Sequence, residues 1–463
     1  MVGITRLGTY FPRRRLDRSL IAKAWGGRAS GTRTVAAGDE DPLTMAVEAC
    51  TACGDDTPPV DAVYFASTSA PYLEKQIASV VATALDLPRA TVVADFAGSL
   101  RAGTAALRAA LDGVAAGTLG RALAVAADGR LAEPESPLEL QLGDGAACVE
   151  VGGEGVVAEL VGGAAISQEF THFWRTDEQR YVQVADARFG NQYGYGVDVP
   201  EAVSAALRKA ELPAEKVTAY ALAAPDARTA AAAAKRIGAN PDTQLVAPLT
   251  AETGMLGAPE PFVLLSRALE TAAPGDFLVM AAYGEGADAL VFRATDALPQ
   301  ARPRALADVL AGGIPVASYE KYLRARSILP ADVGGEFFST YMEWKELRQD
   351  LRLYGCRCEV CGLVQYPRNR VCHQCKARDR MTDHKLAKRG TVFTFTIDNL
   401  VGQVTEHPMP MVVVDLDGGG RVYMQGTDCA EGDIAVGTPV RLTYRRLHEA
   451  GGNRNYYWKV RPA

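Results

Sequence analysis

Four cysteines in two equally spaced pairs have the clearest chemistry of any residues in this 463-residue chain. Cys358 and Cys361 are separated by two residues, and ten residues later Cys372 and Cys375 repeat the spacing. Two such pairs bring four thiolates to tetrahedral distance around Zn²⁺. A closed four-cysteine site has no open position for a substrate, so we expect a structural zinc ion that supplies folding energy to a small segment.

A second chemical candidate lies between Asp95 and Leu107, in the sequence DFAGSLRAGTAAL. An apolar run leads there through Gly-Ser into an alanine-rich helix. A side chain at such a strand-to-helix turn lies over the helix N-terminus, whose N–H groups favour a developing anion. Enzymes place a catalytic Cys or Ser at this point. Here the residues are Ser99, Leu100 and Arg101, so Ser99 is a candidate catalytic residue.

His172 is the only histidine in the first 335 residues, and it lies in the loop sequence Thr-His-Phe-Trp-Arg. General acid–base catalysis at neutral pH most often uses histidine, and loops often carry functional residues. A lone histidine is more often structural, so both roles stay open. Trp174 and Arg175 of this loop, together with Arg101, are candidate substrate-binding residues.

Two further patterns have structural interpretations. Cys50 and Cys53 form another CxxC pair, but they come late in an apolar helix predicted from Pro42 to Cys53, so we interpret them as packing residues. GDGAA and GEGAD lack the Lys-Ser/Thr of a Walker loop and the full Rossmann spacing. They are better explained as tight turns.

The elements that position these residues occur twice in the first 296 residues. In each copy an apolar strand is followed by a glycine-bearing turn and helix, a second strand, and a Gly-x-Gly-Ala turn that opens a third strand. The matched segments are Val60–Ser67 and Val217–Ala224, Gly98–Leu111 and Gly254–Leu269, Ala122–Ala127 and Phe277–Ala282, and the strands after Gly143 and Gly284. Continuous apolar strands that alternate with helices indicate a layered α/β fold with buried sheets. We predict a duplicated domain over 1–296, with halves of about 1–165 and 166–296.

The rest of the chain is predicted to have a different architecture. Residues 297–335 have the Pro, Ala and Arg content of a linker with short helical pieces. Residues 336–388 combine an amphipathic helix (Phe337 to Leu353) with the cysteine quartet. Residues 389–463 contain five short strands, with a hairpin signal at Asp417-Gly-Gly-Gly420, and five such strands suit an OB-type barrel. The predicted strands are Thr391–Asp398, Met411–Asp417, Arg421–Asp428, Val440–Leu447 and Tyr456–Arg461.

Composition and charge argue against several classes of function. Residues 336–463 carry 19 Lys+Arg and 15 Asp+Glu, a balance of +4, which leaves −10 for the first 335 residues. That charge balance permits a phosphate-bearing ligand but is less basic than nucleic-acid-binding domains usually are, although Tyr456, Tyr457 and Trp458 could stack bases.

The apolar runs of the sequence are too short to span a bilayer. Charges follow the apolar part of the N-terminus, the reverse of a secretory signal, so we expect a cytoplasmic protein.

Residues 1 to about 296 resemble the thiolase superfamily, and are most similar to hydroxymethylglutaryl-CoA synthase and ketoacyl-ACP synthase III. Residues 336–463 resemble the zinc-ribbon plus OB-fold accessory domain of thiolase-type enzymes. The first resemblance rests on GITRLGTYFPRRRLDR, STSAPYLEKQIASVVATALDLP, DFAGSLRAGTAAL, ELQLGDGAACVEVG, FWRTDEQRYVQVADARFG, ETGMLGAPEPFVLLSRALE and AAYGEGADALVF. It implies a five-layer αβαβα fold, a homodimer, and a cysteine acylated from a CoA or carrier-protein thioester.

The positions that the resemblance assigns to catalysis carry unsuitable residues. The nucleophile position falls at Leu100, the acidic residue at Thr68, the histidine at Ala223 and the asparagine near Thr253. Leucine cannot attack a thioester, and alanine cannot move a proton. A shift of the alignment by one residue would put Ser99 at the nucleophile position, but an unassisted serine is a poor nucleophile.

We therefore expect an enzyme that makes or breaks a carbon–carbon bond on a thioester without a covalent cysteine. Such aldol or Claisen-like chemistry needs an oxyanion site, which the helix N-terminus at Ser99–Arg101 could supply, and one acid–base group. His172, Asp226 or Glu252 could be that group. The substrate would be a CoA thioester or a phosphopantetheine carrier, and neither nucleic acid nor membrane is expected as a partner. The alternatives are acyl transfer through Ser99, a non-catalytic thioester-binding or scaffold subunit, and nucleic-acid binding.

Overall fold

The computed structural model describes residues 1–54, 59–329, 339–399 and 408–463. Its contacts divide the chain into two compact units. Unit 1 holds residues 1–36, 41–82 and 87–319, and unit 2 holds residues 37–40, 83–86 and 320–463. The division falls inside the predicted linker, 297–335, of which residues 330–335 lie outside the described residues. The predicted domain boundaries therefore stay a prediction.

Unit 1 is built on one nine-stranded sheet in the order β11-β12-β13-β8-β1-β7-β6-β4-β5. The first half supplies β1 (Gly3–Tyr10), β4 (Ala62–Ala66), β5 (Val92–Phe96), β6 (Arg121–Asp128) and β7 (Gly145–Gly152). The second supplies β8 (Ala158–Ser167), which begins before the predicted boundary at about residue 165, and β11 (Val217–Leu222), β12 (Phe277–Tyr283) and β13 (Gly286–Ala294). The halves meet where β1 pairs with β8. All four matched pairs of segments fall on equivalent elements, so the predicted duplication is confirmed.

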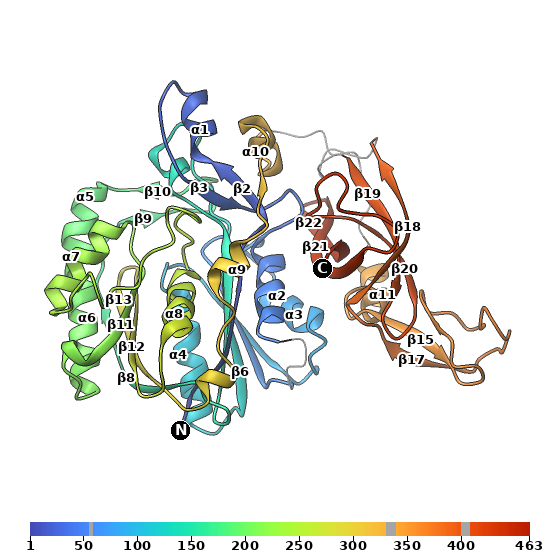
Figure 1. Ribbon diagram of the computed structural model, residues 1–463, viewed down its shortest axis with the longest axis horizontal. Coiled ribbons are helices and arrows are strands. Elements are labelled where there is room, and N and C mark those ends of the chain that lie inside the picture. The colour runs from blue at the N-terminus through green and yellow to red at the C-terminus, as the bar shows by residue number, and fades with distance from the viewer. Residues whose placement is uncertain (55–58, 330–338, 400–407) are drawn as a thin grey trace. The chain divides into compact units, whose positions relative to one another are not determined.

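The helices form layers on both sides of this sheet. In Figure 1, α4 (Ala102–Ala115) and α8 (Glu260–Thr271) lie in the middle of unit 1. On its outer sides are α2 (Pro42–Ala52) and α3 (Ile77–Ala84), and α6 (Gly196–Lys209) and α7 (Ala227–Ile237). One apolar core cluster joins α4 and α8 to strands of both halves. Burial of these alanine- and leucine-rich faces positions the N-termini of both helices.

Smaller elements complete unit 1. They are β2 (Arg14–Asp17), α1 (Arg18–Ala24), β3 (Thr32–Val35), β9 (Phe173–Trp174), β10 (Gln183–Val184), α5 (Ala187–Phe189), a π-helical turn (Gly190–Tyr195), α9 (Leu306–Leu310), β14 (Ile314–Pro315) and 3₁₀ turns at Pro137–Leu140, Ala214–Lys216 and Leu298–Gln300. Helix α2 confirms the predicted apolar helix. Cys50 and Cys53 are both buried beside Cys148, with 3.5 Å between the Sγ atoms of Cys50 and Cys148. They are packing residues, as predicted.

Unit 2 begins with α10 (Tyr319–Ala325), whose first residue belongs to unit 1, and α11 (Thr340–Asp350). Of the amphipathic helix predicted from Phe337, residues 337 and 338 lie outside the described residues. A three-stranded sheet follows, formed by β15 (Tyr354–Cys358), β16 (Val364–Gln365) and β17 (Met381–Lys385).

The C-terminal part of unit 2 is a five-stranded antiparallel sheet in the order β20-β19-β18-β21-β22. Its strands are β18 (Arg389–Asp398), β19 (Met409–Leu416), β20 (Arg421–Gln425), β21 (Pro439–Ala450) and β22 (Asn453–Pro462). The predicted Asp417–Gly420 turn joins β19 to β20. An isolated bridge between Gly426 and Val460 connects the two edges of the sheet, as closure into a barrel requires. The five predicted strands are confirmed.

Candidate functional site

Two adjoining pockets in unit 1 form the candidate site. The outer pocket has a volume of about 790 Å³, within the range of ligand sites, and the inner pocket has about 50 Å³. Phe173, Pro225 and Met255 line both pockets, so the two pockets are neighbours. The sequence-predicted residues His172 and Asp226 line the outer pocket.

Leu100 lines the inner pocket and occupies the turn between β5 and α4. Ser99 lines neither pocket, and its hydroxyl donates to the carbonyl of Gly284 at 3.3 Å. The turn therefore presents leucine, not serine, to the cavity. Ala223, where the resemblance expects a histidine, lines the same pocket. The N-cap of α4, Arg101, makes no side-chain cap hydrogen bond, while its backbone N–H donates to the Ser99 hydroxyl at 3.4 Å and that of Ala102 donates to the Ser99 carbonyl at 3.0 Å.

His172 and Asp226 have different surroundings. His172 is buried and stacks on Phe173, with ring centroids 4.2 Å apart. Burial lowers the pKa of His172, so the ring is neutral at pH 7. Asp226 is exposed and caps α7, accepting from the backbone N–H of Thr229 at 2.8 Å and from the Thr229 hydroxyl at 3.0 Å. The catalytic roles of Ser99, His172 and Asp226 stay predictions.

The three predicted substrate-binding residues line neither of these pockets. The Arg101 guanidinium donates to the carbonyls of Ile166 and Glu285, both at 3.2 Å, and contacts the buried Asp288. Arg175 donates to the carbonyl of Thr68 at 3.0 Å, and Trp174 is exposed on β9. These contacts give Arg101 a structural function in holding α4 against the β12–β13 turn.

Glu260, which sequence reasoning missed, is the buried carboxyl group of the inner pocket. It begins α8, and its Oε2 accepts from the backbone N–H of Leu256 at 3.2 Å. Burial raises the pKa of Glu260 from 4.5 to about 7, even though the nearby Arg130 guanidinium opposes the shift. Its sequence signal is weak, a Glu between two prolines in ETGMLGAPEPFVLL. A carboxyl group with a pKa near neutrality is suited to general acid–base catalysis.

Arg130, two residues after β6, shares the inner pocket with Glu260. Its Nη2 donates to the carbonyl of Met255 at 3.3 Å. Gly257 allows this approach, because its φ is +84° and a Cβ there would lie 2.5 Å from Asp128 Oδ2 and 2.9 Å from Arg130 Nε. Asp128 in turn accepts from the hydroxyls of Ser67, Thr68 and Ser69 at 2.7–3.0 Å. This network holds the floor of the pocket in place.

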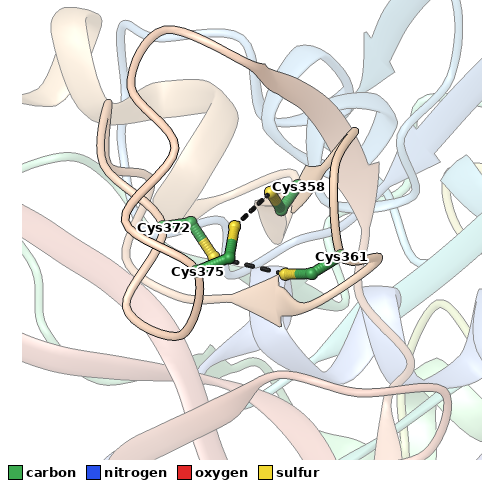
Figure 2. A group of neighbouring side chains, drawn as sticks. All are labelled: Cys358, Cys361, Cys372 and Cys375. Carbon is green, nitrogen blue, oxygen red and sulfur yellow. Dashed lines mark hydrogen bonds between the residues drawn. The ribbon is translucent and has the colours of Figure 1, made fainter.

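The cysteine quartet of unit 2 has the geometry of a metal site. Figure 2 shows the four thiols turned toward one another, and their Sγ atoms all lie within 4.8 Å of each other. Two of the S–S distances are 3.5 and 3.6 Å. A tetrahedron with Zn–S bonds of about 2.3 Å has edges of about 3.8 Å, so the quartet fits Zn²⁺. Cys356 Sγ instead contacts Gln365 and Asn369, and it lies outside the quartet.

Comparison with known structures supports the fold of both units. A 3-hydroxy-3-methylglutaryl-CoA complex of MvaS has a TM-score of 0.60 at 23% identity, and an HMG-CoA synthase complexed with CoA has 0.63 at 19%. Each covers 73% of this chain and 94% of its own. FabH of Pseudomonas aeruginosa has a TM-score of 0.56 at 19% sequence identity, and the match covers 64% of this chain and 98% of that protein. A family model described as the C-terminal OB-fold domain of ChsH2 matches residues 383–445. The thiolase-type and OB-fold predictions are confirmed.

Sequence relatives define the family. The hydroxymethylglutaryl-CoA synthase of Methanopyrus kandleri is 28% identical over 318 residues, which are 66% of this chain and 91% of that protein. The enzyme of the same name from Methanocella arvoryzae is 31% identical over 301 residues, which are 62% of this chain and 85% of that protein. The chain therefore belongs to the hydroxymethylglutaryl-CoA synthase family.

Proposed function

We propose that the protein makes or breaks a carbon–carbon bond beside the carbonyl of a CoA thioester, without forming an acyl-enzyme. The inner pocket carries this proposal. Its described lining contains no cysteine, serine, threonine, lysine or histidine, and it presents Leu100 and Ala223 in their place. It does contain Glu260, a carboxyl group that can take up and release a proton near pH 7.

The two pockets divide the substrate between them. The outer pocket has room for the pantetheine arm of CoA, the ligand present in the structurally similar HMG-CoA synthase. The acyl end would enter the inner pocket, with the thioester oxygen directed toward the N-terminus of α4. Oxyanions are favoured there by the backbone N–H groups and the helix dipole. Carbon–carbon chemistry of this type needs an enolate and a proton carrier but no covalent intermediate.

Exchange of the α-protons of acetyl-CoA tests this proposal. In D₂O, the purified protein is expected to place deuterium on the acetyl group, because enolate formation removes an α-proton. Ala223→Leu adds three carbon atoms to a cavity of about 50 Å³ and is expected to abolish exchange. Calorimetry with CoA should still detect binding to this variant. Binding of acetyl-CoA by the wild type without exchange would support a non-catalytic subunit instead.

We also propose that the quartet Cys358, Cys361, Cys372 and Cys375 holds a structural Zn²⁺. The ion would have all four positions filled by thiolates, so it would stabilise β15–β17 and would not bind substrate. The homodimer and delivery by a carrier protein remain predictions. Among the described residues, no helix is both long and apolar enough to cross a bilayer.

A further inference from the structure

Two tyrosines that line the inner pocket have buried hydroxyl groups that lack a partner. They are Tyr195 and Tyr283, and their side chains are 0% and 7% exposed. Neither hydroxyl makes a hydrogen bond to the described part of the chain. A buried polar group without a partner destabilises a fold, so native proteins seldom keep one unless a ligand or water binds it. Two tyrosines with such hydroxyls in the lining of one small cavity indicate a site for an oxygen-bearing ligand.

The two tyrosines reach the pocket from different elements. Tyr195 ends the π-helical turn, a type of segment that is frequent at functional sites, and Tyr283 ends β12. Their rings meet edge to face, with centroids 5.7 Å apart. The Tyr283 hydroxyl packs on Gly194, where a Cβ would lie 2.1 Å from it. Any other residue at 194 would displace this hydroxyl.

Electrostatics set the roles of these groups. Burial raises the pKa of both tyrosines, and the Glu260 carboxylate adds to the shift at Tyr195. Both hydroxyls therefore stay protonated at neutral pH and act as hydrogen-bond donors. The pKa of Glu260 is about 7, so this carboxyl group changes charge near neutral pH. Arg130 supplies a buried Nε that has no hydrogen-bond partner in the described part of the chain. The pocket thus combines two neutral donors, one fixed cation and one proton carrier.

Resting on the proposed function, we propose that Glu260 is the catalytic proton-transfer residue and that the hydroxyls of Tyr195 and Tyr283 bind the 3-oxygen of a short 3-hydroxyacyl thioester. In the cleavage direction, the Glu260 carboxylate takes the proton of the 3-hydroxyl group. The C2–C3 bond breaks, C3 becomes a carbonyl carbon, and the electron pair forms the thioester enolate. Glu260 then returns the proton to C2. The products are an aldehyde or ketone and the shortened acyl thioester, and no other reactant is consumed.

The volume of the inner pocket limits the leaving carbonyl compound. With about 50 Å³ the inner pocket is small, so we expect it to hold a leaving carbonyl compound of only a few non-hydrogen atoms. Acetaldehyde and acetone fit this limit. A long-chain aldehyde does not, so 3-hydroxybutyryl-CoA is the expected type of substrate and 3-hydroxydodecanoyl-CoA is not.

Cleavage of 3-hydroxybutyryl-CoA, followed by the release of acetyl-CoA, tests the role of Glu260. Glu260→Gln is expected to lower kcat about 1,000-fold, which is within the range for loss of a general acid–base group. The wild-type rate should rise with pH through about 7, because the carboxylate form accepts the first proton. The residual rate of the variant should lack this inflection. Retention of more than a third of kcat, or of the inflection, would overturn the assignment.

The tyrosines are tested against a matched control. Tyr195→Phe and Tyr283→Phe are expected to lower kcat about 10- to 100-fold, the effect of a lost hydrogen bond to a developing charge. Their unfolding temperatures should not fall, because each removed hydroxyl has no partner in the protein. Tyr220 is fully buried, but its hydroxyl donates to the carbonyl of Ala214 at 2.9 Å, outside the pockets. Tyr220→Phe should lower the unfolding temperature and keep kcat. The opposite pattern would refute the binding role.

The exchange and cleavage assays distinguish this inference from the proposed function on which it rests. If the wild type exchanges the α-protons of acetyl-CoA but does not cleave 3-hydroxybutyryl-CoA, the proposed function stands and the 3-hydroxyacyl assignment fails. If neither reaction occurs, both fail. Faster cleavage of 3-hydroxydodecanoyl-CoA than of the four-carbon substrate would show that the inner pocket does not set the chain length.

Discussion

Glu260→Gln is expected to gain stability relative to the wild type as the pH rises from 5 to 8. In the folded protein, burial raises the pKa of Glu260 to about 7, whereas the unfolded chain has the ordinary value of 4.5. Between these values the folded state binds more protons than the unfolded state, so the wild type loses stability as the pH rises. From pH 5 to pH 8 the wild type loses about 2.5 kcal/mol of stability in this way, and glutamine, which does not titrate, avoids this loss.

Calorimetric unfolding of both proteins at pH 5 and pH 8 measures this effect. The unfolding temperature of the variant, minus that of the wild type, should be larger at pH 8 than at pH 5. Glu159→Gln is the control, because Glu159 is on the partly exposed surface and pairs with Arg293 at 2.6 Å. It should show no such gain. An equal difference at both pH values would mean that Glu260 is ionised in the folded protein and is not poised near neutrality.

Loss of the cysteine quartet is expected to have the largest effect on unit 2. Cys358→Ser or Cys372→Ser should reduce bound zinc from about one ion per chain to nearly none, because a site with three thiolates binds the ion far more weakly. Zinc contributes about 10–16 kcal/mol of apparent binding free energy to small zinc-dependent folds. The segment from β15 to β17 should therefore unfold and become sensitive to protease. Elemental analysis and limited proteolysis measure the two effects.

Cys356→Ser provides the matched comparison for this experiment. Cys356 lies two residues before Cys358 and is buried in the same strand, but its sulfur is outside the quartet. This variant should keep its zinc and its resistance to protease. Equal zinc loss in Cys356→Ser and Cys358→Ser would contradict the proposed ligand set.

The sequence carried enough periodicity to predict the elements. Strands β4 and β11, helices α4 and α8, and strands β6 and β12 each come from continuous apolar or alanine-rich runs that recur in the same order. The cysteine quartet was predictable because the spacing of its residues is local. The turn between β5 and α4 was predicted from the sequence, and the family resemblance assigned the nucleophile position within it to Leu100, which lines the inner pocket.

The polar groups that line the inner pocket were not predictable in this way. Glu260, Arg130, Tyr195 and Tyr283 come from four separate elements, and only packing in three dimensions brings them together. No spacing marks them, since a lone Glu or Tyr before or after a buried segment is ordinary. His172 was a candidate because histidine is rare in this chain. No sequence signal, however, separates a neutral histidine that stacks on Phe173 from a catalytic histidine.

The mass of the intact chain during turnover of acetyl-CoA or 3-hydroxybutyryl-CoA most directly tests whether carbon–carbon chemistry proceeds here without an acyl-enzyme. We predict that acid-quenched wild-type protein keeps its unmodified mass while product forms. A chain that gains the mass of an acyl group at the rate of turnover, with the adduct on Ser99 or on any cysteine, would contradict the account.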